Sequence, residues 1–417
     1  MGKGERVNNQ VENSRMFKRG SALGYLEDED RFLTARADPE FSFGVIGCGM
    51  MGQEHIYNAL LVGRAKIGGL FDPAAKSIDT ATRLIAKNGQ QDAPRIYASL
   101  AQACADPDTD ALIVATPNYT HIDVTRAVVG SNKALFVEKP IATTVADAFE
   151  VCQLAAAHSQ PVRFGLQYRY KSVYAEALTE VFERRSVGRV HSVNMLEHRF
   201  PFLDKVQQWN KFSANTGGTL VEKCCHYFDL MNLFAGGNPQ RVFAVGSQAV
   251  NFHNFVYDNK KADGLDQAQM SIQYDNGVIG GFSLCMFTPG TREELVVCGD
   301  AGRVHASESA RLGEPNENHL EVWCGENGAS SVRAPEYPSY ITKAGHHGST
   351  FFEHLSFVDE LSSGVVSGPN LADGLWSVAV GAAAQLSIER GAAVDVAEVL
   401  PADFDPAQWI KTNFQED

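Results

Sequence analysis

Three glycines spaced as Gly47-x-Gly49-x-x-Gly52 constrain the fold of this chain most strongly. They follow an apolar segment at residues 41–46 that predicts a β-strand, and they open a predicted helix. A second predicted strand ends at Asp72, 20 residues after Gly52. This glycine pattern between a strand and a helix, with an acidic residue at this distance, is typical of a βαβ unit that binds a dinucleotide.

Each glycine has a distinct physical role in such a unit. Gly47 permits the tight turn, Gly49 lets the backbone approach a pyrophosphate, and Gly52 lets the helix pack closely against the strand. The helix is predicted from about Gln53 to Val62, and the free N–H groups at its N-terminus are suited to phosphate oxygens.

The carboxylate of Asp72 can accept both ribose hydroxyls of NAD and would repel a 2′-phosphate, so NAD is favoured over NADP. An alternative, compatible with the first, is that Asp72 caps the next helix, with Pro73 at its first position.

Helices and buried strands alternate from residue 41 to residue 166, which predicts a doubly wound parallel sheet. Polar or turn residues follow two of these strands, as Thr116-Pro117-Asn118, with His121 next, and as Glu138-Lys139-Pro140. Such sheets bind ligands at the carboxyl ends of their strands, so we expect these clusters to face one crevice.

A second cluster of polar residues lies on a predicted helix at residues 220–234, directly after Gly217-Gly218. Glu222, His226 and Asp229 are spaced four and three apart and share one face of this helix. Cys224 and Cys225 belong to its apolar side and are expected to be core thiols. A histidine on a helix is commonly structural or solvated, but one turn from a carboxylate it is also a candidate for proton transfer.

Residues 239–333 change to strand patterns, with clean alternation at residues 267–274 and a hairpin turn at Asp275-Asn276-Gly277. We expect a large, mostly antiparallel sheet with one packed face, the other facing solvent or a second subunit. Helices at residues 349–362 and 372–390 end the fold. Four parts of the chain are predicted. Residues 1–40 form an arm and residues 41–162 a Rossmann domain. Residues 163–400 form a substrate and oligomerisation domain, onto which the last helices pack back, and residues 401–417 form a tail. The arm is either poorly ordered or packed along its own domain or a partner subunit.

The composition excludes several classes of function. The formal net charge of −14 disfavours a nucleic-acid partner. No apolar run approaches the ~18 residues of a membrane helix, and residues 1–40 lack the apolar core of a signal peptide. The eight cysteines show no metal-binding spacing, and His346-His347 are expected in a loop, so we predict a cytoplasmic protein without a metal site.

Taken together, these motifs resemble the glucose–fructose oxidoreductase, inositol dehydrogenase and rhizopine-catabolism (Gfo/Idh/MocA) family, over residues 41–400. The resemblance implies a Rossmann domain followed by an α/β domain with a large open sheet. It also implies NAD(P) chemistry on sugars or cyclitols, and homodimers or homotetramers joined through the sheet face.

The family's catalytic set is the lysine of Glu-Lys-Pro and an Asp-x-x-x-His on the later helix. Lys139 and His226 match it, whereas Glu222, one methylene longer, replaces the aspartate and is followed by Lys223. Glu222 either still orients the substrate or the imidazole, or is neutralised by the ammonium group of Lys223. The resemblance also implies cofactor contacts from Gly47, Gly49, Met50, Met51, Gly52, Asp72, Thr116, Pro117, Asn118, His121, Glu138, Lys139 and Gln167. Substrate contacts are expected from Arg169, Tyr170, Trp209 and Asp229, although Trp209 also suits a core or surface position.

The expected reaction moves a hydride from a secondary alcohol to nicotinamide and a proton to a base. We expect His226 to be the base and Lys139 to stabilise the developing alkoxide, with Glu222 holding a neighbouring hydroxyl. Alternatively, Lys139 itself transfers the proton. Two rival functions remain open from the sequence: a glycoside hydrolase or lyase acting through transient oxidation by NAD, and a regulatory protein that binds NAD without turnover.

Overall fold

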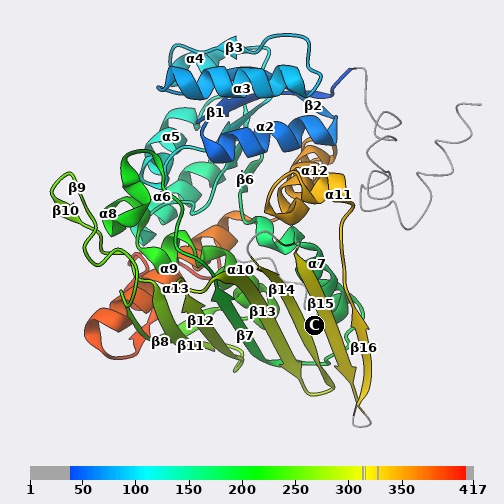
Figure 1. Cartoon of the computed structure of the whole chain (residues 1–417), viewed down its shortest axis with the longest axis vertical. Helices are drawn as coiled ribbons and strands as arrows, with labels where there is room; N and C mark the ends of the chain where they lie inside the picture. The colour runs from blue at the N-terminus through cyan, green and yellow to red at the C-terminus, as the bar shows by residue number, and fades with distance from the viewer. Residues whose placement is uncertain (1–37, 312–313, 315, 326–327, 410–417) are drawn as a thin grey trace, which may run out of the picture. The chain divides into compact units, whose positions relative to one another are not determined.

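The computed structural model describes residues 38–409 except 312–313, 315 and 326–327 (Figure 1). The chain divides into two compact units. The first unit consists of residues up to Ala115 with Ser131–Leu135 and Tyr337–Gly368, and the second of Thr116–Gly130, Phe136–Glu336 and Pro369 onward. Most of the arm predicted at residues 1–40, and half of the tail predicted at 401–417, lie outside the described residues. The predicted domain boundaries stay predictions.

A six-stranded sheet has the order β3-β2-β1-β4-β5-β6, and β1 pairs in parallel with both β2 and β4. Strands β4 and β5 are buried along their whole length, as expected for strands covered by helices on both faces. The predicted doubly wound parallel sheet is therefore confirmed, and only the two-residue strand β3 has no sequence prediction. The elements are β1 (Phe41–Ile46), α2 (Met50–Val62), β2 (Ala65–Phe71), α3 (Ala75–Lys87), β3 (Arg95–Ile96), α4 (Leu100–Ala105), β4 (Ala111–Val114), β5 (Ala134–Val137) and β6 (Val162–Phe164).

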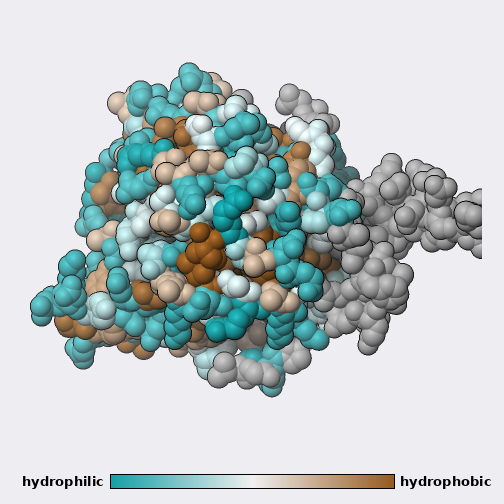
Figure 2. Space-filling view, turned by 90° about the horizontal axis from the view of Figure 1, so that it is seen from above, coloured by the Kyte–Doolittle hydropathy of each residue, from teal (hydrophilic) through white to brown (hydrophobic). Residues whose placement is uncertain are grey.

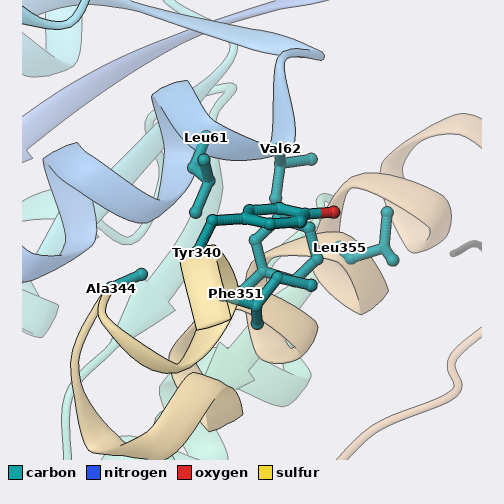
Figure 3. Packing of buried hydrophobic residues seen from close by; sticks show 7 residues of the cluster. Leu61, Val62, Tyr340, Ala344, Phe351 and Leu355 are labelled. Atoms are coloured by element: carbon teal, nitrogen blue, oxygen red, sulfur yellow. The ribbon is translucent and has the colours of Figure 1, made fainter. Parts of the chain in front are cut away.

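The chain returns to the first unit through two late helices, α11 (Ser339–Thr342) and α12 (Ser349–Ser363). Their Tyr340 and Phe351 side chains pack against Leu61 and Val62 of α2 (Figure 3). Burial of one such large apolar side chain stabilises a fold by about 1.5–3 kcal/mol. This cluster ties a segment from near the end of the chain to the first helix after the glycine motif.

The second unit is built on a nine-stranded sheet with the order β16-β15-β14-β13-β7-β12-β11-β8-β17. Adjacent strands in this sheet run antiparallel, except β7 and β12, which pair in parallel. The alternating pattern predicts β11 with its observed ends, and the predicted open, mostly antiparallel sheet is confirmed. The strands are β7 (Val190–His198), β8 (Pro239–Ser247), β11 (Gln267–Tyr274), β12 (Ile279–Cys285), β13 (Gly290–Gly299), β14 (Gly302–Arg311), β15 (Glu317–Cys324), β16 (Ala329–Arg333) and β17 (Val394–Asp395), with a separate hairpin of β9 (Val256–Tyr257) and β10 (Lys260–Lys261).

Helices cover the inner face of this sheet. The longest of them, α13 (Leu371–Arg390), packs against β8, α10 and α6. Its length and mean hydropathy of 1.3 would also suit a membrane span, contrary to the expectation that no apolar run approaches that length. However, 72% of that window is buried inside the protein, as in a core helix. The other helical segments are α5 (His121–Val128), α6 (Val145–Ala156), η4 (Gln167–Tyr170), α7 (Ser172–Leu178), which continues as a π-helix to Glu183, η6 (Val206–Lys211), α8 (Ser213–Thr216), α9 (Thr219–Glu222) and α10 (Cys225–Ala235).

The surface shown in Figure 2 is mostly hydrophilic, with hydrophobic residues in small groups between polar ones. This is the distribution expected for a face that water covers.

Candidate active site

The glycine loop of the first unit has the shape that the sequence predicts. Gly47 has a φ of +91°, which other residues adopt only with strain. A Cβ on Gly52 would lie 1.9 Å from the Gly47 carbonyl oxygen, whereas a Cβ on Gly49 would meet no atom within 4 Å. Because α2 begins at Met50 and has no acidic residue in its first turn, its N-terminus fits a phosphate group.

The Asp72 carboxylate lies against this loop. Its Oδ2 accepts a hydrogen bond of 2.8 Å from the Cys48 backbone N–H, and its Oδ1 accepts one from Ala74. Helix α3 begins at Ala75 with Ala74 as its N-cap, so the expected helix start at Pro73 is wrong by two residues. Two backbone donors hold the carboxylate in place, and its remaining lone pairs suit ribose hydroxyls.

In the second unit, His121 joins two of the predicted clusters. Its imidazole is fully buried, with Nδ1 2.7 Å from the Pro140 carbonyl oxygen and Nε2 3.0 Å from that of Thr116. Burial lowers the pKa of this histidine, and the hydrogen bonds to the two carbonyls only partly oppose the effect. His121 thus braces the segment at Thr116 against the turn that carries Lys139. The cofactor role predicted for His121 stays a prediction.

Lys139 reaches the second cluster directly. Its Nζ donates a hydrogen bond of 3.0 Å to the main-chain carbonyl oxygen of Glu222. Its neighbour Glu138 is buried, and the Glu138 Oε2 accepts from the Lys139 backbone N–H at 3.0 Å. Two residues 83 positions apart in the sequence are therefore in contact within one unit.

The single helix predicted at residues 220–234 is wrong in detail. Helix α9 ends at Glu222 and α10 begins at Cys225, so Lys223 and Cys224 form a break between them. Helix α10 is buried on every side, so its predicted polar face does not face solvent. Cys224 and Cys225 are buried free thiols, as expected.

Glu222 is the most perturbed carboxyl in this cluster. Its side chain is only 7% exposed, and among the described residues its Oε2 has no hydrogen-bond partner. Burial raises the pKa of Glu222 to about 7, although the positive charge of Lys139 acts in the opposite direction. Near neutral pH this carboxyl is therefore poised to gain or lose a proton.

His226 is the second residue of α10 and is 2% exposed. The ring of Tyr168 stacks on the His226 imidazole, with centroids 4.1 Å apart and planes 5° from parallel. The Tyr168 hydroxyl accepts from Lys223 Nζ at 2.9 Å and donates to Glu293 at 3.1 Å. Tyr168 was missed from the sequence, because no local spacing links it to His226.

Two predicted substrate residues bind each other. Arg169 donates to both carboxylate oxygens of Asp229, at 2.7 and 2.5 Å, and lies 3.1 Å from Asp373 of α13. Burial by itself would lower the pKa of Arg169, but the two carboxylates outweigh it and raise that pKa. This buried triad holds η4, α10 and α13 together, and the substrate role of its members stays a prediction.

The remaining predicted residues lie in different surroundings. The Tyr170 hydroxyl accepts from Arg163 at 3.2 Å. The half-buried Trp209 packs edge-on against Tyr119, with centroids 6.3 Å apart. Asn118 and Gln167 are buried, and Pro117 is half-buried. These placements leave their cofactor and substrate roles as predictions.

Comparison with known proteins identifies the class. An oxidoreductase family with an NAD-binding Rossmann fold matches residues 41–166, and the C-terminal alpha/beta domain of the same GFO_IDH_MocA family matches residues 180–396. The chain belongs to this family of NAD-binding oxidoreductases.

Individual relatives are distant. A Bacillus subtilis oxidoreductase is 34% identical over 146 residues, which are 34% of this chain and 33% of that protein. The myo-inositol 2-dehydrogenase of Thermotoga maritima is 23% identical over 86% of this chain and 99% of its own length. A crystal structure of scyllo-inositol dehydrogenase from Lactobacillus casei, with bound NAD(H) and scyllo-inositol, aligns with a TM-score of 0.67 at 20% identity, covering 86% of this chain and 99% of that one. At this identity the structural likeness shows the fold alone.

Proposed function

We propose that this protein is an NAD-dependent dehydrogenase that oxidises a secondary alcohol of a sugar or cyclitol. The observation that carries the proposal is the hydrogen bond from Lys139 Nζ to the main-chain carbonyl oxygen of Glu222. His226 follows Glu222 by four residues in the same segment. Family membership supports the redox chemistry, and the names of the inositol dehydrogenases among its relatives support the substrate class.

Lys139 stabilises the reacting oxygen. An ammonium group has three N–H donors, and the Glu222 carbonyl occupies one of them. The others remain for the substrate oxygen, whose negative charge grows as the C–H bond breaks. When bound, NAD accepts the hydride.

His226 takes the proton from the alcohol. Because the stacked Tyr168 ring fixes the plane of the imidazole, the orientation of the base is set before substrate arrives. Ionised Glu222 accepts a hydrogen bond from a neighbouring hydroxyl, which selects substrates with two adjacent hydroxyl groups.

Substitution of Lys139 tests this assignment. We expect Lys139→Ala and His226→Ala each to lower turnover by at least ~10²-fold while NAD binding, measured by calorimetry, is retained. The assay follows reduced nicotinamide absorbance with cyclitols, aldoses and glycosides, with NAD and NADP in parallel. Lys87→Ala, in a lysine at the end of α3, serves as a control and should leave turnover unchanged. Full turnover in the Lys139 variant would remove it from the mechanism, and release of sugar from glycosides without net NADH would replace the dehydrogenase by a hydrolase.

We further propose that the protein is a cytoplasmic homodimer or homotetramer joined through the outer face of the nine-stranded sheet. Large apolar side chains on this face are exposed, among them Phe243, Val245, Ile279 and Val332, at 46–60%. All eight cysteines are free, which agrees with a reducing compartment. Sedimentation analysis of the wild type and of Ile279→Lys tests the interface, and a monomeric wild type would exclude it.

A further inference from the structure

Three potential metal ligands, His305, His319 and Glu321, lie together on the outer face of β14 and β15, with Glu294 of the neighbouring strand β13 beside them. His305 of β14 pairs directly with Glu321 of β15, and His319 lies two residues further along β15. Directly opposed side chains on one face of a sheet are about 5 Å apart, and diagonal ones are within reach of long side chains. Because the residues flanking His305, Val304 and Ala306, are buried, the histidine itself points to the outer face.

The distances within this cluster suit a small metal ion. One ligand atom from each of His305, His319 and Glu321 lies within 4.8 Å of the others. The His305 Nε2 is also 3.1 Å from Oε1 of Glu294, on β13. Bonds of about 2.0–2.2 Å in a tetrahedral zinc site place ligand atoms roughly 3.3–3.5 Å apart. Rotation of the His305, His319 and Glu321 side chains would bring their ligand atoms to these spacings. Glu294, which contacts His305, would then supply the fourth ligand of a site with two nitrogen and two oxygen atoms.

The cluster also has the surroundings of a metal site. The His305 Nε2 atom is buried, and no described residue forms a hydrogen bond of good geometry with it. Arg292 donates to the other carboxylate oxygen of Glu294, at 2.6 and 3.0 Å, and Arg303 lies 3.9 Å from Glu321. Such outer contacts orient the ligand oxygens toward the histidines.

We propose that Glu294, His305, His319 and Glu321 form a structural site for one divalent transition-metal ion, with Zn²⁺ as the best fit. Imidazole ligands favour zinc, nickel or copper over magnesium and calcium. The ion would cross-link three strands at a place separate from Lys139, Glu222 and His226, so the site is independent of the proposed dehydrogenase activity.

Zinc binding by the full-length protein tests the proposal. After treatment with EDTA and dialysis, calorimetry with Zn²⁺ should show one ion per chain, and Zn²⁺ but not Mg²⁺ should raise the melting temperature. His305→Ala and His319→Ala should each weaken binding by at least ~10-fold, since loss of a mere supporting contact already costs about 10–100-fold. The conservative Glu321→Gln variant provides the same test if an alanine variant does not fold.

The matched control is His191→Ala, in an exposed histidine of β7 whose Nε2 lies 3.9 Å from the carboxylate of Asp300. This variant should bind zinc like the wild type. Absence of zinc binding by the wild type would overturn the proposal. Unchanged binding in the His305 variant, or sulfur ligands in X-ray absorption spectra of the zinc protein, would also overturn it.

Discussion

Replacement of Glu222 by glutamine should make the protein more stable at alkaline pH and less active. The glutamine has nearly the same shape but cannot ionise, so the variant isolates the effect of charge. In the folded protein burial raises the pKa of Glu222 to about 7, against a usual value of 4.5. In the unfolded chain the carboxyl returns to its usual value.

The sign of the effect follows from these two values. Below about pH 4.5 the carboxyl is protonated in both states, and its stabilising contribution is fully present. As the pH rises toward 7, the unfolded chain loses this proton first and is favoured. Since each pH unit between the two values corresponds to 1.36 kcal/mol, the wild type loses about 3 kcal/mol of stability by pH 8. Glu222→Gln does not undergo this loss.

Urea unfolding followed by tryptophan fluorescence measures the difference, because all four tryptophans lie in the second unit with Glu222. The free energy of unfolding of Glu222→Gln should exceed that of the wild type by about 3 kcal/mol at pH 8, and the gap should narrow as the pH falls toward 5. Turnover should fall in the same variant. In the control Glu150→Gln, whose surface carboxyl has a pKa lowered by Arg126, the pH dependence should have the opposite sign. A wild-type advantage at pH 8 would refute the reasoning about buried charge.

Three further predictions concern other parts of the molecule. Gly52→Ala should prevent correct folding of the glycine loop, because its Cβ would lie 1.9 Å from the Gly47 oxygen; circular dichroism and NAD calorimetry should both reveal the damage. Gly49→Ala meets open space, so the same measurements should show a folded protein with weaker NAD binding. Arg169→Met leaves the buried carboxylate of Asp229 without its main partner and should lower the free energy of unfolding by about 3–5 kcal/mol, whereas an effect below 1 kcal/mol would show that the ion pair is dispensable.

Local pattern was sufficient to predict much of this protein. The glycine spacing predicts the first βαβ unit because the backbone turn, the helix contact and the strand are all within a few residues of each other. Strict alternation predicts β11 for the same reason, since one face of the strand is buried and the other is not. Where the pattern is not local, prediction is weaker. The two-residue strand β17 joins the sheet only through pairing with β8, in which Val394 lies opposite Val242 and Asp395 opposite Arg241.

In the candidate site, too, the sequence predicts the reactive residues, but their contacts appear only in the folded structure. Sequence motifs single out Lys139 and His226 as residue types suited to the chemistry, but only the tertiary structure shows the ammonium of Lys139 on the Glu222 carbonyl and the Tyr168 ring on the imidazole. The expected absence of a metal site rested on spacing along the chain, whereas His305 and His319 become neighbours through strand pairing.

The fold class and the kind of cofactor can be read from the sequence, because both depend on short segments whose backbone geometry is encoded by a few glycines and alternating apolar residues. The raised pKa of Glu222, the burial of the Arg169–Asp229 pair and the break between α9 and α10 appear only in the folded structure. These properties depend on how far water and distant charges are from each group, and that distance is set only when the whole unit has folded.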